Sequence, residues 1–489
     1  MTQRNPHLRA VVLAGGSGQR FWPLSRELNP KQLLSMFGTE SLIAQAVHRI
    51  LPFAEGGSSV AIATNERLFD ELRNHLTAHE DTALHAVRYI QEPVAKNTAP
   101  AIALAAAVFA AEDPEAIMVV LPSDHLLEGG QLWAECIEAA MAVAADGYLV
   151  TIGITPTRPE TGYGYIRAGE PLDGRAIGGA VPHVAAEFVE KPDADRAQEF
   201  VDSGRYYWNA GIFVMKVQQV LDELDAAGGE EARIAEAARW IAAQDPADRN
   251  GREAFDRFSA LASISIDKAV MERSEHVAVI PAPLEWSDVG SLLALECVAP
   301  ADERGNVRLG RGLDIDSVNS LIYSGDRLVA TLGVEDLIVV DTSDATLVLP
   351  KNRAQDVRHV FDALKAVGAP EVTKPKVSLR PWGSWMSLLD SPAYQIKYIE
   401  VKPGARISLQ KHRHRSEHWI VVSGSAMVER DDERIEVHQN EGVFLPVGCV
   451  HRMQNVGKVP LVVIEVQVGE YLGEDDIVRL EDDWNRESD

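Results

Sequence analysis

Short apolar runs alternate with alanine-rich stretches over roughly the first 290 residues. Continuous apolar runs at 9–16 (RAVVLAGG), 59–64 (SVAIAT) and 116–122 (AIMVVLP) predict buried strands. The run 100–113 (PAIALAAAVFAAED) predicts a helix between the last two of these strands. Strands that alternate with helices in this way predict a largely parallel sheet with helices on both faces, whose ligands gather at the carboxyl ends of the strands.

The start of that helix is marked by local signals. Pro100 fits an early helical position, and Thr98 is the expected cap because its hydroxyl can accept a hydrogen bond from a first-turn N–H group.

The pattern changes near residue 300. Short β-branched runs with Gly, Asp and Asn turns predict a small all-β connector, for which a β-helix is one form. The run 351–368 (KNRAQDVRHVFDALKAVG) predicts a helix that ends at a glycine, and 372–381 (VTKPKVSLRP) predicts a linker.

From residue 382 onward the alternation has a period of two. Runs such as YQIKYIEV, HWIVVSGSAMVER and PLVVIEVQVG, separated by proline- and glycine-rich turns, predict a closed antiparallel barrel or jelly roll. The acidic end, 474–489, is expected to be a surface helix or a frayed tail. We therefore expect three parts: an α/β domain with a Rossmann-like mixed sheet over 1–295, the β connector with its helix over 296–370, and a C-terminal β-barrel over 371–489.

Composition narrows the class of protein. The 489 residues are 46% hydrophobic and 25% charged, as in an ordinary soluble globular protein. The net charge of −26 argues against binding to nucleic acid or to anionic membranes. The three cysteines form no paired motif, the apolar stretch near the start is too short for a signal peptide, and no apolar run is long enough to span a membrane. We expect a cytoplasmic protein.

Positive charge is concentrated in two short segments of this acidic chain. Residues 1–31 carry a net charge of +4 and residues 397–415 a net charge of +5. Such runs are usually solvated surface. Both segments, however, contain motifs that suggest binding of phosphate groups.

The first motif is the loop LAGGSGQRFWPLSRELNPKQLL (13–34) after the first predicted strand. Its glycines allow a ligand close to the backbone N–H groups. Phe21 stands where a dinucleotide-binding fingerprint needs glycine, and the Gly-Lys-Ser/Thr of a P-loop is absent. Arg20 and Lys31 remain as cations near the loop.

This string resembles the GGxGxR…PK signature of the sugar-1-phosphate nucleotidylyltransferases, and its WPLSR and NPKQ parts resemble mannose-1-phosphate guanylyltransferases. The usual leucine after the arginine is Phe21 here. Six further segments resemble motifs of that family and occur in the same order: QEPVAKNTAPAIALAA (91–106), LPSDH (121–125), TGYGYI (161–166), FVEKP (188–192), WNAGIFV (208–214) and EWSDVGS (285–291).

The resemblance implies transfer of GMP from GTP to mannose 1-phosphate, giving GDP-mannose and pyrophosphate. Catalysis of such a transfer is mostly positioning and charge neutralisation. The implied roles are Arg20 on the triphosphate, Lys31 on the leaving pyrophosphate, and Asp124 with Asp288 on Mg²⁺, although a lone loop aspartate is more often a helix cap.

The remaining predicted ligand contacts of this site fall into two groups. The nucleotide-binding set is Leu13, Ala14, Gly15, Gly16, Gly18, Gln91, Asn97 and Thr98. The sugar-phosphate set is Gly162, Glu190, Lys191 and Asn209. Tyr163 and Tyr165 fit sugar contacts and ordinary core or rim positions equally well, and the preference for guanine rests on the resemblance alone.

The second basic segment contains GARISLQKHRHRSEHWIVVSG (404–424). A period of two places Gln410, His412 and His414 on one face of a strand. A turn in 446–455 (PVGCVHRMQN) can bring a further histidine to the same place. Two histidines, a glutamate and a glutamine suit Zn²⁺ or another divalent metal, and the predicted ligands are Gln410, His412, Glu417 and His451.

These two segments resemble the two motifs of the cupin family, and more closely the type II phosphomannose isomerases. Gln410 replaces the first histidine, Asn440 replaces a turn glycine, and Arg413 stands between the histidines. The resemblance implies interconversion of fructose 6-phosphate and mannose 6-phosphate through an enediol. Arg415, with Lys411 or Arg413 as further candidates beside it, would bind the phosphate or steady the enediolate.

The base that moves the proton stays open between His414 and Glu465, and Cys449 is expected to be a packed thiol.

We therefore expect a bifunctional homodimeric enzyme that uses GTP, mannose 1-phosphate, mannose 6-phosphate and fructose 6-phosphate. One alternative is a guanylyltransferase whose cupin module is non-catalytic. Another is a cupin that senses a metal or a sugar phosphate and regulates the first domain.

Overall fold

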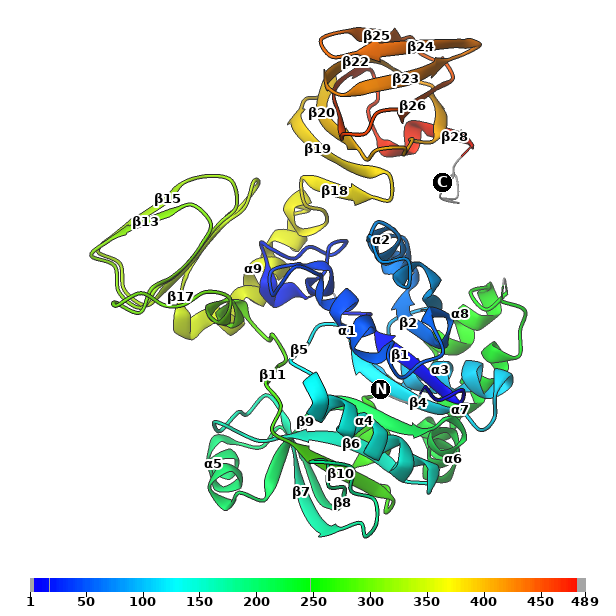
Figure 1. The fold of residues 1–489 in the computed structure, drawn as a ribbon, viewed down its shortest axis with the longest axis vertical. Coiled ribbons are helices and arrows are strands. Elements are labelled where there is room, and N and C mark those ends of the chain that lie inside the picture. The colour runs from blue at the N-terminus through cyan, green and yellow to red at the C-terminus, as the bar shows by residue number, and fades with distance from the viewer. Residues whose placement is uncertain (1–3, 17, 247, 482–489) are drawn as a thin grey trace. The chain divides into compact units, whose positions relative to one another are not determined.

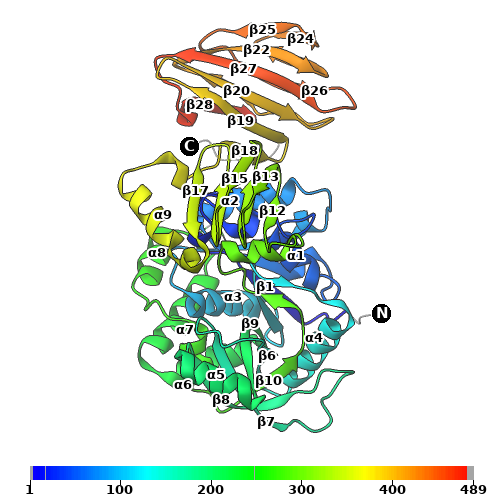
Figure 2. The same ribbon diagram turned by 90° about the vertical axis from the view of Figure 1, so that its left-hand side faces the viewer.

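A computed structural model of the chain describes residues 4–16, 18–246 and 248–481. The chain divides into two compact units (Figures 1 and 2), a larger one that includes most residues up to 372 and a smaller one that includes residues 373 onward. Within the described ranges we find no helix with the length and apolar character that a membrane crossing requires.

The larger unit is built on a nine-stranded sheet in the order β3-β2-β1-β4-β9-β6-β10-β8-β7. Only β8 and β9 run against the other strands, so the sheet is largely parallel but mixed, as predicted. The strands are β1 (Leu8–Leu13), β2 (Val60–Asn65), β3 (Arg88–Glu92), β4 (Ile117–Pro122), β6 (Leu149–Ile154), β7 (Gly164–Pro171), β8 (His183–Glu190), β9 (Tyr206–Lys216) and β10 (Val277–Ala282).

Helices cover this sheet on both sides. Figure 2 shows α3 on one side of the central strands and α4 on the other. Side chains of β4 share one buried core with α3, α6 and α7. The α-helices of the chain are α1 (Leu42–Ile50), α2 (Glu66–Thr77), α3 (Thr98–Glu112), α4 (Gly130–Ala145), α5 (Ala194–Ser203), α6 (Val217–Ala227), α7 (Gly229–Ala242), α8 (Arg252–Ser259) and α9 (Val357–Ala366).

The cap of α3 lies one residue before the predicted one. Asn97, not Thr98, is the N-cap: its side-chain oxygen accepts a hydrogen bond of 2.8 Å from the backbone N–H of Thr98. Asn97 has φ 72°, a conformation that asparagine tolerates better than threonine does. The hydroxyl of Thr98 instead accepts from the backbone N–H of Ile266.

The β connector follows the sheet in the larger unit. Parallel pairs join β12 to β14, β14 to β16 and β13 to β15, and this coiling is the β-helix form of the predicted connector. The predicted helix over 351–368 begins as a 3-10 helix, Lys351–Asp356, and only then becomes α9. The strands are β12 (Val307–Leu309), β13 (Gly312–Ile315), β14 (Leu321–Ser324), β15 (Val329–Leu332), β16 (Leu337–Asp341) and β17 (Thr346–Pro350).

The smaller unit consists of two facing antiparallel sheets, in the orders β18-β19-β20-β27-β22-β25 and β24-β23-β26-β21-β28. Apolar side chains such as Trp419, Val428 and Met453 form its buried core, as the predicted barrel requires. The strands are β18 (Val377–Arg380), β19 (Gly383–Asp390), β20 (Tyr394–Val401), β21 (Leu409–His412), β22 (Arg415–Ser423), β23 (Ser425–Arg430), β24 (Glu433–His438), β25 (Gly442–Leu445), β26 (His451–Asn455), β27 (Leu461–Gly469) and β28 (Ile477–Glu481).

Two segments of this unit differ from the prediction. The supposed linker contains β18, which pairs with β19, and the acidic end contains β28, which pairs with β21. Both are edge strands, where pairing with a neighbour satisfies the backbone and a weakly apolar sequence suffices. The predicted tail beyond residue 481 lies outside the described residues.

Candidate functional site

A cavity of about 450 Å³ lies in the larger unit. It gathers the four residues predicted to carry out the transfer: Arg20, Lys31, Asp124 and Asp288. The pairing of β5 (Leu126–Leu127) with β11 (Trp286–Ser287) explains how the two aspartates meet, because each lies next to one of these short strands. The full lining is Gly18, Gln19, Arg20, Phe21, Lys31, Asp124, His125, Asp288, Val289, Gly290 and Arg358.

The glycine loop is held close to Lys31. Gly18 has φ 60°, and a Cβ atom at this position would lie 2.7 Å from the Cβ of Lys31, so only glycine fits. The buried Gln32 donates hydrogen bonds to the backbone carbonyls of Ala14 and Gly16. Sequence reasoning missed Gln32 as the residue that orders this loop, although it lies within the quoted NPKQLL string.

Lys31 joins the two acidic loops. Its Nζ lies 2.7 Å from Asp124 Oδ2 and donates to the backbone carbonyls of Asp288 (2.8 Å) and Val289 (3.0 Å). These contacts occupy all three N–H donors of the ammonium group. Burial alone would raise the pKa of Asp124, but the Lys31 charge outweighs it and holds this pKa below its ordinary value. The role of Lys31 on pyrophosphate stays a prediction.

The carboxylates of Asp124 and Asp288 suit a hard divalent cation. Both line the same cavity, and oxygen ligands are those that Mg²⁺ prefers. A Cβ atom at Gly290 would lie only 2.8 Å from Asp288 Oδ2, so glycine keeps space beside this carboxylate. The hydroxyl of Tyr163 donates to Asp288 Oδ1 at 2.7 Å. The sequence left the role of Tyr163 open. In the structure its hydroxyl orients a predicted metal ligand.

The predicted sugar-phosphate residues lie around the ends of β7, β8 and β9. A Cβ atom at Gly164 would lie 2.7 Å from Glu190 Oε2 and 3.4 Å from the Cβ of Asn209, which places these three residues together. Lys191 forms an ion pair of 2.8 Å with Glu190, and Gly162 is exposed. Tyr165 is fully buried and is a core residue.

The side chains of the predicted base-side residues serve contacts within the fold. Gln91 accepts a hydrogen bond from Asn250, and Asn97 and Thr98 bond to the backbone around α3 as described above. Leu13 ends β1, and Ala14 follows it into the loop. Their contacts with a nucleotide stay predictions.

Glu92, at the end of β3, was missed by sequence reasoning. Its side chain is buried beside Gly15, and its oxygen lies 3.5 Å from the place of a Cβ there. Burial raises the pKa of Glu92 to about 7, so its charged form weakens the fold.

We expect Glu92→Gln to stabilise the protein more at pH 8 than at pH 5. In the unfolded chain the carboxyl ionises near its ordinary pKa, whereas in the folded chain it stays protonated up to about pH 7. Its cost therefore builds up between these two values and is complete above pH 7, amounting to about 3 kcal/mol. Thermal unfolding of both proteins at the two pH values measures this, and an equal shift in Tm at both would contradict it.

The smaller unit brings together three of the four predicted metal ligands. His412 Nε2 lies 2.9 Å from Glu417 Oε1, and His451 Nε2 lies 3.5 Å from Glu417 Oε2. All three side chains are buried, and their ligand atoms lie within 4.8 Å of one another. Although Glu417 lies close, neither ring nitrogen of His412 nor Nε2 of His451 forms a hydrogen bond of suitable geometry among the described residues. Buried, convergent and unsatisfied donor atoms of this kind fit a divalent metal.

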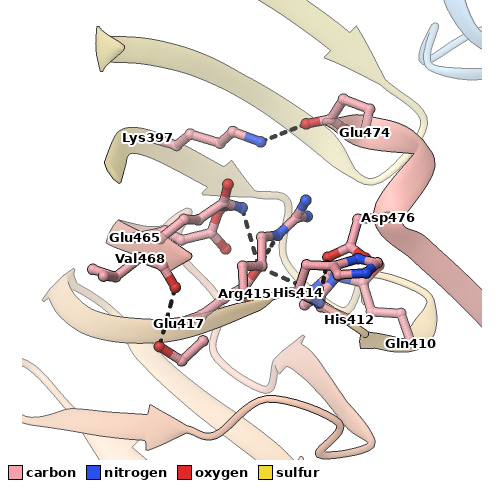
Figure 3. A network of polar contacts seen from close by, with 12 residues as sticks. Lys397, Gln410, His412, His414, Arg415, Glu417, Glu465, Val468, Glu474 and Asp476 are labelled. Carbon is pink, nitrogen blue, oxygen red and sulfur yellow. Dashed lines mark hydrogen bonds and ion pairs between the residues drawn. The ribbon is translucent and has the colours of Figure 1, made fainter. Parts of the chain in front are cut away.

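Gln410 and His414 differ in their surroundings (Figure 3). Gln410 pairs with His451 across β21 and β26, which keeps it beside the three ligands, and its Oε1 accepts from Ser408 at 2.9 Å. His414 was expected on the same face. Its side chain is instead 55% exposed and bonds to Asp476, because β21 ends at His412 and the alternation stops there.

A buried polar network continues from Glu417 (Figure 3). Trp419 and Gln467 each donate to both Glu417 and Glu465, and Arg415 donates to Glu417 at 3.3 Å. Burial, aided by the charge of Glu417, raises the pKa of Glu465 to about 8. The proton of Glu465 therefore exchanges close to neutral pH, in the interior of the barrel. Cys449 is buried in the barrel core, as expected.

Three families match successive parts of the chain. Residues 9–305 match the nucleotidyl transferase family, which is more than half of the chain.

The chain belongs to the nucleotidyl transferase family.

Its other two parts match named domains as well. Residues 310–364 match the MannoseP isomerase/GMP-like beta-helix domain, and residues 368–482 match the mannose-6-phosphate isomerase C-terminal domain. The predicted succession of an α/β domain, a β connector and a cupin barrel is thereby confirmed.

This nucleotidyl transferase is similar along its whole length to curated proteins. It is 41% identical to the xanthan biosynthesis protein XanB of Xanthomonas campestris over 97% of this chain and 98% of that one. It is 39% identical to the mannose-1-phosphate guanylyltransferase of Klebsiella pneumoniae over 98% of this chain and 100% of that one. A solved structure described as mannose-1-phosphate geranyltransferase from Thermus thermophilus is 32% identical, with a TM-score of 0.63, over 73% of this chain and 99% of that one.

Proposed function

We propose that the protein transfers GMP from GTP to mannose 1-phosphate and releases pyrophosphate. The observation that carries this proposal is the single cavity lined by Arg20, Lys31, Asp124 and Asp288. The relatives named as mannose-1-phosphate guanylyltransferases along the whole chain support the choice of substrates.

The proposed roles of the residues that line the cavity follow from their charges. Arg20 binds the triphosphate, while Asp124 and Asp288 would hold Mg²⁺, which would supply charge to neutralise phosphate oxygens. Lys31 sets the spacing of the two acidic loops through its three contacts. Glu190 and Asn209 bind sugar hydroxyls, and Lys191 binds the sugar phosphate. We also propose that the enzyme is a homodimer, which the molar mass in solution tests.

A nucleotide panel tests this function directly. The purified protein is given mannose 1-phosphate, Mg²⁺ and GTP, ATP, UTP, CTP or dTTP, and pyrophosphate release is followed. We expect GTP to be the best substrate, and GDP-mannose to be the product. Release with none of the five nucleotides would refute the assignment.

We propose that the barrel interconverts fructose 6-phosphate and mannose 6-phosphate. The buried set of His412, Glu417 and His451, with Gln410 beside it, would hold Zn²⁺ or another divalent metal. Such a metal polarises a carbonyl group when bound. Arg415 is fully buried next to Glu417 and supplies positive charge for the phosphate or the enediolate.

Glu465 is the better of the two candidate bases. It lies in the barrel interior and shares Trp419 and Gln467 with Glu417, whereas His414 is half-exposed and paired with Asp476. Its raised pKa of about 8 lies near neutral pH, which suits a group that both takes and returns a proton.

We expect Glu465→Gln to lower kcat of the isomerase by about a hundredfold or more, since the amide cannot accept the proton. GDP-mannose formation from mannose 1-phosphate should be unchanged. Exchange of the sugar C2 proton with deuterated water, followed by NMR, measures the proton transfer itself. The matched variant His414→Gln should keep the exchange, and loss of exchange in that variant alone would name His414 as the base.

The alternatives of a non-catalytic or a regulatory cupin give different results. Conversion of fructose 6-phosphate to mannose 6-phosphate with any of several divalent metals supports the isomerase. No conversion, with GDP-mannose formation that responds to sugar phosphates, would identify a sensor instead. No conversion and no response would leave a non-catalytic module.

A further inference from the structure

The β connector contributes one residue to the nucleotidyl-transfer cavity. Arg358 lies in α9 and lines the same cavity as Arg20, Asp124 and Asp288. In sequence it lies beyond residues 9–305, which match the nucleotidyl transferase family, and within the β-helix match of 310–364. Sequence reasoning missed it, because the helix was taken only as part of a connector.

The position of α9 against the signature loop is fixed by specific contacts. The indole N–H of Trp22 donates to the carbonyl of Glu371 at 3.1 Å, and the backbone N–H of Glu27 donates to the carbonyl of Val372 at 2.9 Å. Lys365, on α9 itself, pairs with the buried carboxylate of Glu27 at 2.6 Å. The connector helix is therefore anchored to the segment that carries Arg20 and Lys31.

The charge of the cavity shows why another cation matters. Three cationic side chains line the cavity: Arg20, Lys31 and Arg358. The N–H donors of Lys31 are already taken by Asp124 and by two backbone carbonyls. Arg20 and Arg358 are left to meet the phosphates. A nucleoside triphosphate brings several negative charges, more than one arginine and a metal ion offset.

Arg358 is poorly explained as a structural residue. Its ion pair within the described chain is with Asp362, one turn along α9, at 3.6 Å, and its side chain is 63% exposed. Exposed pairs of this kind contribute little to stability. A guanidinium group is, in contrast, well suited to bind two phosphate oxygens at once.

We propose that Arg358 binds the pyrophosphate part of the nucleotide, so that the connector is part of the nucleotidyl-transfer site. This inference rests on the proposed function. In the transfer, an oxygen of the sugar phosphate bonds to the α-phosphorus. The bond from this phosphorus to the bridging oxygen breaks, and pyrophosphate leaves with the electron pair. Arg358 neutralises part of the charge that appears on this leaving group.

The test compares Arg358→Gln with Arg353→Gln in the full-length protein. Arg353 is a matched control: it is on the preceding 3-10 helix, is also 63% exposed, and pairs locally with Asp356. The reverse reaction is measured with GDP-mannose and pyrophosphate, and the forward reaction with GTP and mannose 1-phosphate. We expect Arg358→Gln to lower kcat/KM for pyrophosphate by about 10- to 100-fold.

Several readouts separate binding from a structural effect. For Arg358→Gln, Tm and the KM for mannose 1-phosphate should stay at the wild-type values, and Arg358→Lys should restore part of the activity. Equal kcat/KM for pyrophosphate in the wild type and Arg358→Gln would overturn the inference, as would an equal loss in Arg353→Gln. If the wild type itself forms no GDP-mannose, the proposed function is wrong. Activity of the wild type therefore distinguishes failure of the proposed function from failure of the inference about Arg358.

Discussion

Replacing Arg20 with alanine should lower kcat of GDP-mannose formation by roughly a hundred- to a thousandfold, the usual effect of removing one electrostatic stabiliser. Arg20 lines the cavity and is exposed to it, and among the described residues no ion pair or hydrogen bond engages its guanidinium group. Its charge is therefore available to the triphosphate. Steady-state assays with GTP and mannose 1-phosphate measure the loss.

The control for this variant is an arginine of similar chemistry outside the cavity. Arg233, on α7, is exposed and pairs with Glu230 at 2.8 Å, so Arg233→Ala should leave kcat unchanged. The tertiary structure of Arg20→Ala should also be intact, with an unchanged Tm, because no hydrogen bond or ion pair among the described residues is lost. A kcat within a few fold of the wild-type value would show that Arg20 is not a catalytic residue.

The sequence predicted the residues of this cavity better than their contacts. Arg20 and Asp124 could be found because each lies in a motif that follows a predicted strand, and parallel strands bring their carboxyl ends to one edge. Asp288 was found through its family motif alone, and it follows β11, which pairs antiparallel with β5 outside the main sheet. The role of Lys31 on pyrophosphate stays a prediction. What the sequence did not indicate is that its ammonium group joins the two acidic loops, a geometry set by the pairing of β5 with β11.

Roles that depend on tertiary contacts could not be predicted. Gln32, Glu92 and Arg358 act through neighbours that are far away in sequence, such as the contact of Glu92 with Gly15 or of α9 with the loop after β1. In the barrel, the period-two alternation of side chains along a strand correctly predicted that Gln410 and His412 lie close together. It failed at His414 because the strand ends first, and strand ends depend on pairing partners rather than on the periodicity of one segment.

The second large effect is expected in the barrel. His412→Ala removes one of three convergent ligand atoms and should lower the isomerase activity by at least about a hundredfold, since even indirect support of a metal ligand is commonly worth 10- to 100-fold. The metal content of the purified protein should fall with the activity. GDP-mannose formation should stay at the wild-type rate, because His412 belongs to the smaller unit and the transfer cavity to the larger one.

His418 provides the matched control within the same motif. Its side chain is exposed and lies against the ring of Phe444 with centroids 4.5 Å apart, on the outside of the barrel. His418→Ala should therefore keep both the bound metal and the isomerase activity. Chelation of the wild type should reproduce the loss seen in His412→Ala, and added metal should reverse the effect of chelation but not that of the substitution. Full isomerase activity in His412→Ala, or in a metal-stripped wild type, would show that this set of residues does not serve the isomerisation.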